Sequence, residues 1–144
     1  MNFVMVGVDG SKYAENALDK AIDLAKRYDT ELRIVHVYNT SSQYYNFPSH
    51  GEFKIPDKDE HIINLFMKSY NEKANKAGLK KVETKIIITP GHAGAGLVAE
   101  AEKKCPVITV VGARGMTGIT RTLLGSVSDY VTKHSPCDVY VVRS

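Results

Sequence analysis

The chain has 144 residues, of which 43% are hydrophobic and 24% charged, a balance typical of soluble globular proteins. We therefore expect one domain over residues 1–144, large enough to form an apolar core without metals or disulfides. The net charge is only +3 and the lysines are scattered, which argues against a nucleic-acid-binding protein. The sequence shows no signal-peptide pattern and no apolar run that could span a membrane, so we expect a cytoplasmic protein without membrane contact.

The two cysteines, Cys105 and Cys137, form no metal-binding motif. Each lies just before an apolar run, so the two are expected to be neighbours in a sheet. We interpret them as structural thiols in a reducing compartment. A redox pair is the alternative.

The first half of the chain begins with a β-branched run at residues 3–8, which predicts a strand followed by the turn Asp9-Gly10-Ser11. Apolar residues at helical spacing predict a helix over residues 12–28. A second strand is expected at residues 32–38. Residues 39–56 are rich in polar residues, Pro and Gly and predict a long loop.

The middle of the chain has the capping-box spacing Asp57-x-x-Glu60, which predicts a helix over residues 57–77 that Gly78 ends. A third strand is expected at residues 82–88. A helix is expected over residues 94–104, ending before a proline.

The last part of the chain has two continuous apolar runs, at residues 107–111 and 139–142, which predict buried strands. A short helix is expected between them, at residues 126–134. Strands that alternate with helices predict an α/β domain in which helices cover both faces of a five-stranded parallel sheet. Ligands bind such sheets beyond the carboxyl ends of the strands, where the winding direction reverses.

A glycine-rich loop follows the strand at residues 107–111. Gly112, Gly115, Gly125 and Ser126 have the spacing G-x2-G-x9-G-[ST], and a helix follows directly. Glycines let backbone N–H groups approach an anion, and a helix start adds unpaired donors and partial positive charge. The loop therefore predicts a phosphate site and a nucleotide ligand. The alternative is a plain turn in which Ser126 caps the next helix.

Charged side chains near this loop suggest further contacts. Arg114 and Arg121 are candidates for binding phosphate, or else are exposed loop residues. Asp9 follows the first strand and is a candidate for the ribose hydroxyls, or else forms an Asx-turn beside Ser11.

Other nucleotide-binding signatures are absent or incomplete. No Walker sequence occurs. The segment 94–99 fits the loose form G-x-G-x-x-A, but the next strand ends without the acidic residue that a dinucleotide site needs. We interpret this segment as the start of a helix with small residues. The five histidines form no metal-ligand pair or catalytic triad, so the sequence indicates no general base or nucleophile.

These residues together resemble the universal stress protein family over essentially the whole chain. The resemblance rests on Val6-Gly-Val-Asp-Gly-Ser11, His36-Val37, Val111-Gly-Ala-Arg-Gly115, Gly125-Ser-Val127 and the terminal Cys137-Asp-Val-Tyr-Val-Val142. The complete glycine pattern is similar to that of the ATP-binding branch. The resemblance implies a doubly wound sheet of order 3-2-1-4-5, of the adenine nucleotide alpha hydrolase-like type. It also implies a homodimer through residues 138–143.

The resemblance further implies ATP with Mg²⁺ or Mn²⁺ in the crevice. Asp9 would then hold the ribose and the backbone of Val37 would meet adenine, while Gly7, Val8 and Val111 would line the base and sugar. The phosphates would be surrounded by Gly112, Arg114, Gly115, Gly125, Ser126 and Val127. The expected function is a nucleotide-dependent regulatory switch in a stress response. The alternatives are a slow ATPase or autophosphorylating protein, with Ser126 and Thr122 as acceptor candidates, and an interaction module that binds no nucleotide.

Overall fold

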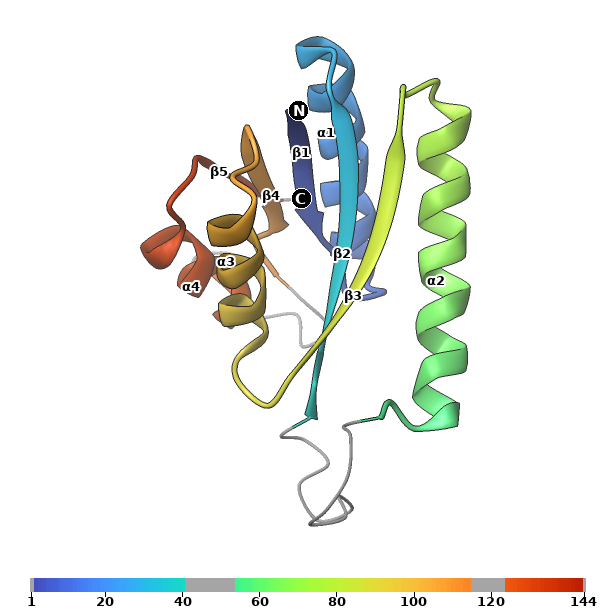
Figure 1. Ribbon diagram of the computed structural model, residues 1–144, viewed down its shortest axis with the longest axis vertical. Coiled ribbons are helices and arrows are strands. Elements are labelled where there is room, and N and C mark those ends of the chain that lie inside the picture. The colour runs from blue at the N-terminus through green and yellow to red at the C-terminus, as the bar shows by residue number, and fades with distance from the viewer. Residues whose placement is uncertain (1, 41–53, 115–123, 144) are drawn as a thin grey trace.

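The computed structural model describes residues 2–40, 54–114 and 124–143 (Figure 1). Helices and strands alternate along these residues, as the sequence predicts. Their bounds are β1 (Phe3–Gly7), α1 (Lys12–Tyr28), β2 (Glu31–Asn39), α2 (Asp57–Lys76), β3 (Val82–Thr89), α3 (Ala93–Lys103), β4 (Ile108–Gly112), α4 (Ser126–His134) and β5 (Val139–Val142).

The five strands form one sheet in the order β3-β2-β1-β4-β5, and every neighbouring pair is parallel. The α/β class and the strand order are therefore confirmed. Val6 of the central strand pairs with Ile34 on one side and Val110 on the other. The winding direction reverses between β1 and β4, which places a crevice at the carboxyl ends of these strands.

Helices cover both faces of the sheet (Figure 1). Helices α1 and α2 lie on one face, and α3 and α4 lie on the other. Strand β1 supplies both cores: Val4 and Val6 pack toward α1 and α2, while Phe3 and Met5 pack toward α3 and α4. A strand that is buried on both faces explains why its sequence is a continuous apolar run.

Helix α1 packs on the sheet through small side chains. Its buried positions include Ala14, Ala17, Ala21 and Ala25, which follow helical spacing. The helix begins after Ser11, whose hydroxyl oxygen accepts a hydrogen bond from the Ala14 backbone N–H at 3.2 Å. This cap fixes the entry of α1 next to the end of β1.

One expected helix cap is wrong, and the cap considered as an alternative at Ser126 does not form. Helix α2 is capped by Pro56 rather than Asp57, because the Glu60 N–H bonds to the Pro56 carbonyl at 2.9 Å. Helix α4 is capped by Gly125, so Ser126 is its first helical residue and makes no side-chain cap. In both helices the capping-box pattern begins one residue after the residue that caps the helix. For α4 this leaves the Ser126 hydroxyl unused by the helix.

Candidate functional site

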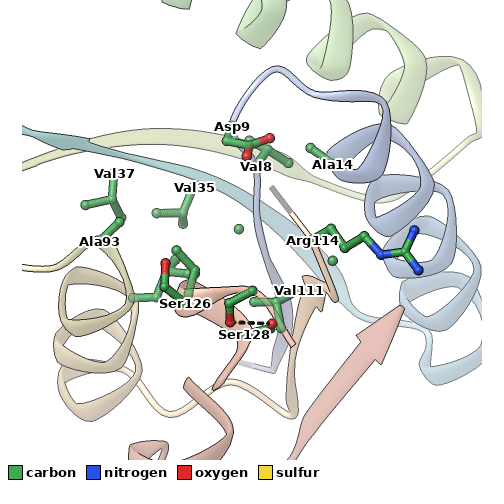
Figure 2. Close-up of a pocket in the computed structure, with 15 residues that line it drawn as sticks. Val8, Asp9, Ala14, Val35, Val37, Ala93, Val111, Arg114, Ser126 and Ser128 are labelled. Atoms are coloured by element: carbon green, nitrogen blue, oxygen red, sulfur yellow. Dashed lines mark hydrogen bonds between the residues drawn. The ribbon is translucent and has the colours of Figure 1, made fainter. Parts of the chain in front are cut away.

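A cavity of about 290 Å³ lies at the carboxyl ends of β1, β2 and β4, between α1, α3 and the start of α4 (Figure 2). We call it the cleft. Its size is close to the lower end of the range of about 300–1,000 Å³ for small-molecule sites. It is lined by Gly7, Val8, Asp9, Ala14, Val35, Val37, Ala93, Leu97, Val111, Gly112, Arg114, Gly125, Ser126, Val127 and Ser128.

The structure brings the sequence-predicted site residues together. Those that it describes all line the cleft: Gly7, Val8, Asp9, Val37, Val111, Gly112, Arg114, Gly125, Ser126 and Val127. Gly115, Arg121 and Thr122 lie outside the described residues. Four separate chain segments thus converge at the crevice where the winding reverses.

Sequence reasoning missed five lining residues: Ala14, Val35, Ala93, Leu97 and Ser128. Val35 lies two residues before Val37 on β2, so the two share one face of the strand. Ala93 and Leu97 are four residues apart on α3 and therefore share a helix face. These spacings were available in the sequence, but which face points into the cleft depends on how α3 packs.

The apolar wall of the cleft depends on glycines. A Cβ atom at Gly7 would lie 2.7 Å from Leu97 Cδ1, and one at Gly96 would lie 2.8 Å from Val37 Cγ1. Each distance is below ordinary van der Waals contact, so a side chain at either position would displace Leu97 or Val37 from the wall of the cleft. Gly94 is packed in the same way against α4. The glycines at 94 and 96 are therefore packing residues at a helix start, as the sequence interpretation proposed.

Asp9 forms the Asx-turn that the sequence allowed. Its Oδ1 atom accepts hydrogen bonds from the Ser11 backbone N–H at 3.0 Å and from the Ser11 hydroxyl at 2.5 Å. Within the described residues, Oδ2 has no recorded partner. Figure 2 shows Asp9 at the edge of the cleft, above Val8. The turn uses one oxygen of the carboxylate and leaves the other to accept hydrogen bonds.

The start of α4 presents backbone donors to the cleft. The Gly125 N–H donates a hydrogen bond to the Ala113 carbonyl oxygen at 2.6 Å. The first N–H that donates within the helix is that of Asp129, which bonds to the Gly125 carbonyl oxygen at 2.9 Å. The N–H groups of residues 126–128 come before that bond and have no helix partner. All three of these residues line the cleft. The helix N-terminus thus gives this side of the cleft unpaired donors and a partial positive charge.

Ser128 fixes where this helix begins. Its buried hydroxyl lies 3.0 Å from the Gly125 carbonyl oxygen and 3.2 Å from that of Ala113, and it can donate to either (Figure 2). Ala113 directly follows β4, so this hydroxyl ties the helix start to the end of a central strand. The donors of α4 are therefore held in place by a side chain that the sequence motif does not include.

Arg114 turns toward α1 in this structure. Its guanidinium lies over the Tyr13 ring, 5.6 Å from the ring centroid, and points away from Val37 and Ala93 (Figure 2). Its buried Nε atom has no hydrogen-bond partner within the described residues. The nearby Gly112 passes close to α1, since a Cβ atom there would lie 3.2 Å from the Tyr13 carbonyl oxygen. Arg114 lies at the cleft as predicted, with its charge at the side that faces α1.

His36 holds the backbone beside the cleft through a contact with Val8. Its Nδ1 lies 2.8 Å from the Val8 carbonyl oxygen, and because a carbonyl can only accept, Nδ1 carries the proton. The ring also packs edge-on against Phe66, with 5.1 Å between the centroids. Burial lowers the pKa of His36 and outweighs the opposing effects of the Val8 bond and the Asp9 charge. The ring is therefore neutral at neutral pH and fixes the backbone that precedes Asp9.

This burial predicts a loss of stability in mild acid. The unfolded chain binds a proton at His36 near the ordinary pKa of 6.5, whereas the folded chain resists it. The free energy of unfolding should therefore fall as pH drops below about 6.5, by at most about 1.4 kcal/mol per pH unit from this group. Urea unfolding at about pH 7.5 and about pH 5.5 measures the fall. His36→Asn keeps a donor for Val8 and does not titrate, so its fall should be smaller; an equal fall would contradict this role.

The described ranges contain neither a membrane-spanning helix nor a metal-binding cluster. No helix there is long and apolar enough to cross a membrane. No group of three or more His, Cys, Asp and Glu side chains is placed there to hold a metal ion.

The fold and the cleft define a doubly wound α/β protein with a cavity at its switch point. The chain matches the model of the Universal stress protein family over residues 1–143. A putative universal stress protein of Staphylococcus saprophyticus is 33% identical over 147 residues, which cover 98% of this chain and 83% of that protein. The chain belongs to the universal stress protein family.

Solved structures share the fold. A universal stress protein in complex with cAMP has a TM-score of 0.73 and 26% identity, covering 99% of this chain and 98% of that one. The universal stress protein of Archaeoglobus fulgidus in complex with dAMP has a TM-score of 0.75 and 19% identity, covering 98% and 97%. The family and the architecture expected from the sequence are thus confirmed.

Proposed function

We propose that the cleft binds an adenine nucleotide, with ATP as the physiological ligand, and that the bound nucleotide regulates the protein. The observation that carries the proposal is the start of α4, where three residues whose N–H groups have no helix partner line the same cavity as Asp9 and an apolar wall. A nucleotide needs these three environments: donors for phosphate, an acceptor for ribose and an apolar surface for the base. The similar protein solved with cAMP supports an adenine ligand.

The base would lie against the apolar wall. Val35, Val37 and Leu97 are aliphatic, and Ala93 leaves room at the start of α3 (Figure 2). The backbone of Val37 would meet the adenine edge. Asp9 Oδ2 would accept hydrogen bonds from the ribose hydroxyls, while Oδ1 keeps the Asx-turn in place.

The phosphates would bind at the start of α4. The N–H groups of Ser126 and Val127 would donate to phosphate oxygens, and the unused Ser126 hydroxyl would add a further donor. Gly112 brings the backbone close, and the Arg114 charge at this edge of the cleft favours an anion. The resemblance of the complete glycine pattern to that of the ATP-binding branch favours a chain of several phosphates over a single one.

A divalent cation would be held mainly by the ligand. Mg²⁺ keeps several waters and binds nucleotides through phosphate oxygens with few protein carboxylates. The described part of the cleft agrees with this, because Asp9 is the carboxylate among its lining residues. Mg²⁺ or Mn²⁺ would therefore neutralise phosphate charge without a dedicated protein cage.

A thermal-shift series tests the ligand class. AMP, ADP and ATP should each raise the Tm of nucleotide-free protein, since a ligand that binds only the folded state stabilises it in proportion to ln(1 + [L]/Kd). GTP at the same concentration should have little effect. If GTP and ATP shift the Tm equally, or neither does, the adenine-nucleotide proposal is wrong.

Asp9 variants test the ribose contact in the same assay. Asp9→Ala should weaken adenosine as well as ATP by about tenfold, because it removes a charge-assisted acceptor. The matched control is Ser11→Ala, which removes a partner of the same turn from outside the cleft. If Ser11→Ala weakens adenosine as much as Asp9→Ala does, the effect comes from the turn and the ribose role is wrong.

A regulatory switch is favoured over an enzyme because the described cleft contains no group placed to activate water or a nucleophile. Single-turnover release of ADP separates the two. The switch predicts that ATP binds and dissociates many times before one molecule is hydrolysed. Release of ADP as fast as ATP binds would instead favour the ATPase. Phosphate transfer to Ser126 would favour autophosphorylation.

We also propose a homodimer through β5 and its flanks, residues 138–143. Strand β5 is the edge of the sheet, where it pairs on one side with β4. An open edge presents unpaired backbone groups to a second chain, and Tyr140 is 37% exposed on this strand. Light scattering should give twice the 15.9 kDa chain mass. The mass of a single chain at high protein concentration would contradict the proposal.

A further inference from the structure

The two cysteines lie side by side at the end of the sheet away from the cleft. Cys105 Sγ and Cys137 Sγ are 3.0 Å apart, although 32 positions separate them in the sequence. The structure describes both as free thiols. The expectation that they are neighbours is therefore confirmed. Such proximity lets one cysteine sulfur attack the other, once that other is bonded to an oxidant, without a rearrangement of the fold.

The two thiols differ in access. Cys105 is exposed at the end of the turn that follows α3, next to Lys104, an exposed residue with no recorded ion pair within the described residues. Cys105 also borders a surface hollow that Arg33 and Lys81 line together with acidic side chains. Cys137 is half-buried, and its backbone is held by Ser135, whose hydroxyl oxygen accepts from the Cys137 N–H at 3.1 Å. A dissolved oxidant therefore reaches Cys105 first.

We propose that Cys105 and Cys137 form a thiol-oxidation site that closes to an intramolecular disulfide by exchange with a low-molecular-weight disulfide such as oxidised glutathione. The Cys105 thiolate attacks one sulfur of the oxidant, the oxidant's S–S bond breaks, and the first thiolate leaves and takes a proton. Cys137 then loses its proton to solvent and attacks the Cys105 sulfur, which expels the second thiol of the oxidant. Two protein thiols are oxidised and one small disulfide is reduced to two thiols, so atoms and electrons balance.

The surroundings of Cys137 fit the role of second nucleophile. Burial, together with the hydrogen bond and the charge of the neighbouring Cys105, raises the pKa of Cys137 to about 12. Cys137 is therefore a thiol at neutral pH and does not compete for the oxidant. Once Cys105 is bonded to the oxidant, its hydrogen bond and charge are gone, which makes Cys137 easier to deprotonate. The order of attack follows from this difference.

The disulfide would enclose the phosphate-binding half of the cleft. Cys105 precedes β4 and Cys137 precedes β5, so the closed loop contains β4, the glycine-rich segment and α4. Strand β5 pairs with β4 over four residues, Val139 to Val142. A covalent link at the start of both strands restricts the unfolded chain and fastens the edge strand. The site lies at the opposite strand ends from the cleft, so oxidation stabilises the fold without blocking the ligand.

Intact-protein mass spectrometry under oxidised glutathione tests the site. The wild-type mass should fall by two hydrogen atoms, peptide mapping should link Cys105 to Cys137, and the Tm should rise by about 5 °C or more. Cys137→Ser should instead accumulate one glutathionyl group on Cys105. The matched variant Cys105→Ser should gain that group on Cys137 at least about tenfold more slowly.

Three results would overturn the proposal. They are a stable glutathionyl group on the wild-type chain, a disulfide between two chains, and two thiols that remain free. Equal rates in the two serine variants would contradict the assigned order of attack. Because both variants retain every residue of the cleft, nucleotide binding should be unchanged in all forms, so failure here is distinguishable from failure of the proposed function.

Discussion

Replacing Ser126 with proline is expected to weaken ATP binding by about tenfold to a hundredfold and to leave adenosine binding unchanged. Proline removes the first N–H of α4, and a charge-assisted hydrogen bond contributes about 1.5–3 kcal/mol. The fold should tolerate the change, because proline is favoured at the first helical position. Gly125, with φ −65° and ψ 163°, already has the extended backbone that a residue before proline adopts. Fluorescence or calorimetric titration with ATP and with adenosine measures the effect.

Ser126→Ala is the matched control, since it removes the hydroxyl and keeps the N–H. Its loss of ATP affinity should be clearly smaller than that of Ser126→Pro. Equal affinity of Ser126→Pro and wild type for ATP would show that phosphate does not bind at the start of α4. An equal loss for adenosine would show that proline had distorted the cleft as a whole.

Replacing Glu100 with alanine is expected to lower the free energy of unfolding by about 3–5 kcal/mol, the range for breaking a buried ion pair. The Glu100 side chain is 4% exposed and accepts two hydrogen bonds of 2.9 Å from Lys85 Nζ. Arg33 Nη1 lies 3.6 Å from the same carboxylate, and the Arg33 side chain is 10% exposed. Without Glu100, the partners left to the buried guanidinium among the described residues are Glu83 and the face of Phe3. The midpoint of urea unfolding measures the loss.

Glu83→Ala is the control for this network. Glu83 bonds to Arg33 at 3.2 Å but is 40% exposed, so water replaces it and the loss should be much smaller. The double variant Arg33→Met with Glu100→Leu should recover part of the stability that Glu100→Ala loses, because no buried charge is left alone. Equal losses for Glu83→Ala and Glu100→Ala would contradict the burial argument.

The fold was predictable because its signals are local. Alternating strand and helix patterns, together with continuous apolar runs such as Val107–Val111, indicated a parallel sheet covered on both faces. The helices at residues 12–28 and 126–134 and the strand at residues 139–142 have the bounds that the structure gives, while the ends of the other elements move by at most one residue. The strand order came from the family resemblance, since no local pattern specifies which strands pair.

The cleft was predictable where its residues belong to a motif and unpredictable where packing decides. Asp9 and Gly125 follow or precede regular elements, so their place at the strand ends follows from chain order. Ser128 and Leu97 line the cleft only because of how α4 and α3 settle on the sheet. The burial of Glu100 also depends on tertiary contacts, because a glutamate on a helix is usually exposed.

The capping boxes failed for a related reason. The pattern at Asp57 contains residue types that favour a helix start. The residue that caps the helix, however, is the one whose backbone carbonyl accepts the first hydrogen bond of the helix. The Pro56 carbonyl is one residue earlier and accepts that bond. At α4 the same shift by one residue leaves Ser126 inside the helix, where its N–H and hydroxyl face the cleft. The capping alternative for Ser126 therefore does not hold, at the residue on which the phosphate proposal depends most.

Isothermal titration calorimetry of nucleotide-free protein with ATP and Mg²⁺ tests the central claim most directly. The account predicts one saturable site per chain with a Kd in the micromolar range, which corresponds to a binding free energy of about −8 kcal/mol. Adenosine should bind the same site more weakly, because it lacks the phosphates that would bind at the start of α4. No binding at millimolar ATP would contradict the account and leave the family fold without its proposed ligand.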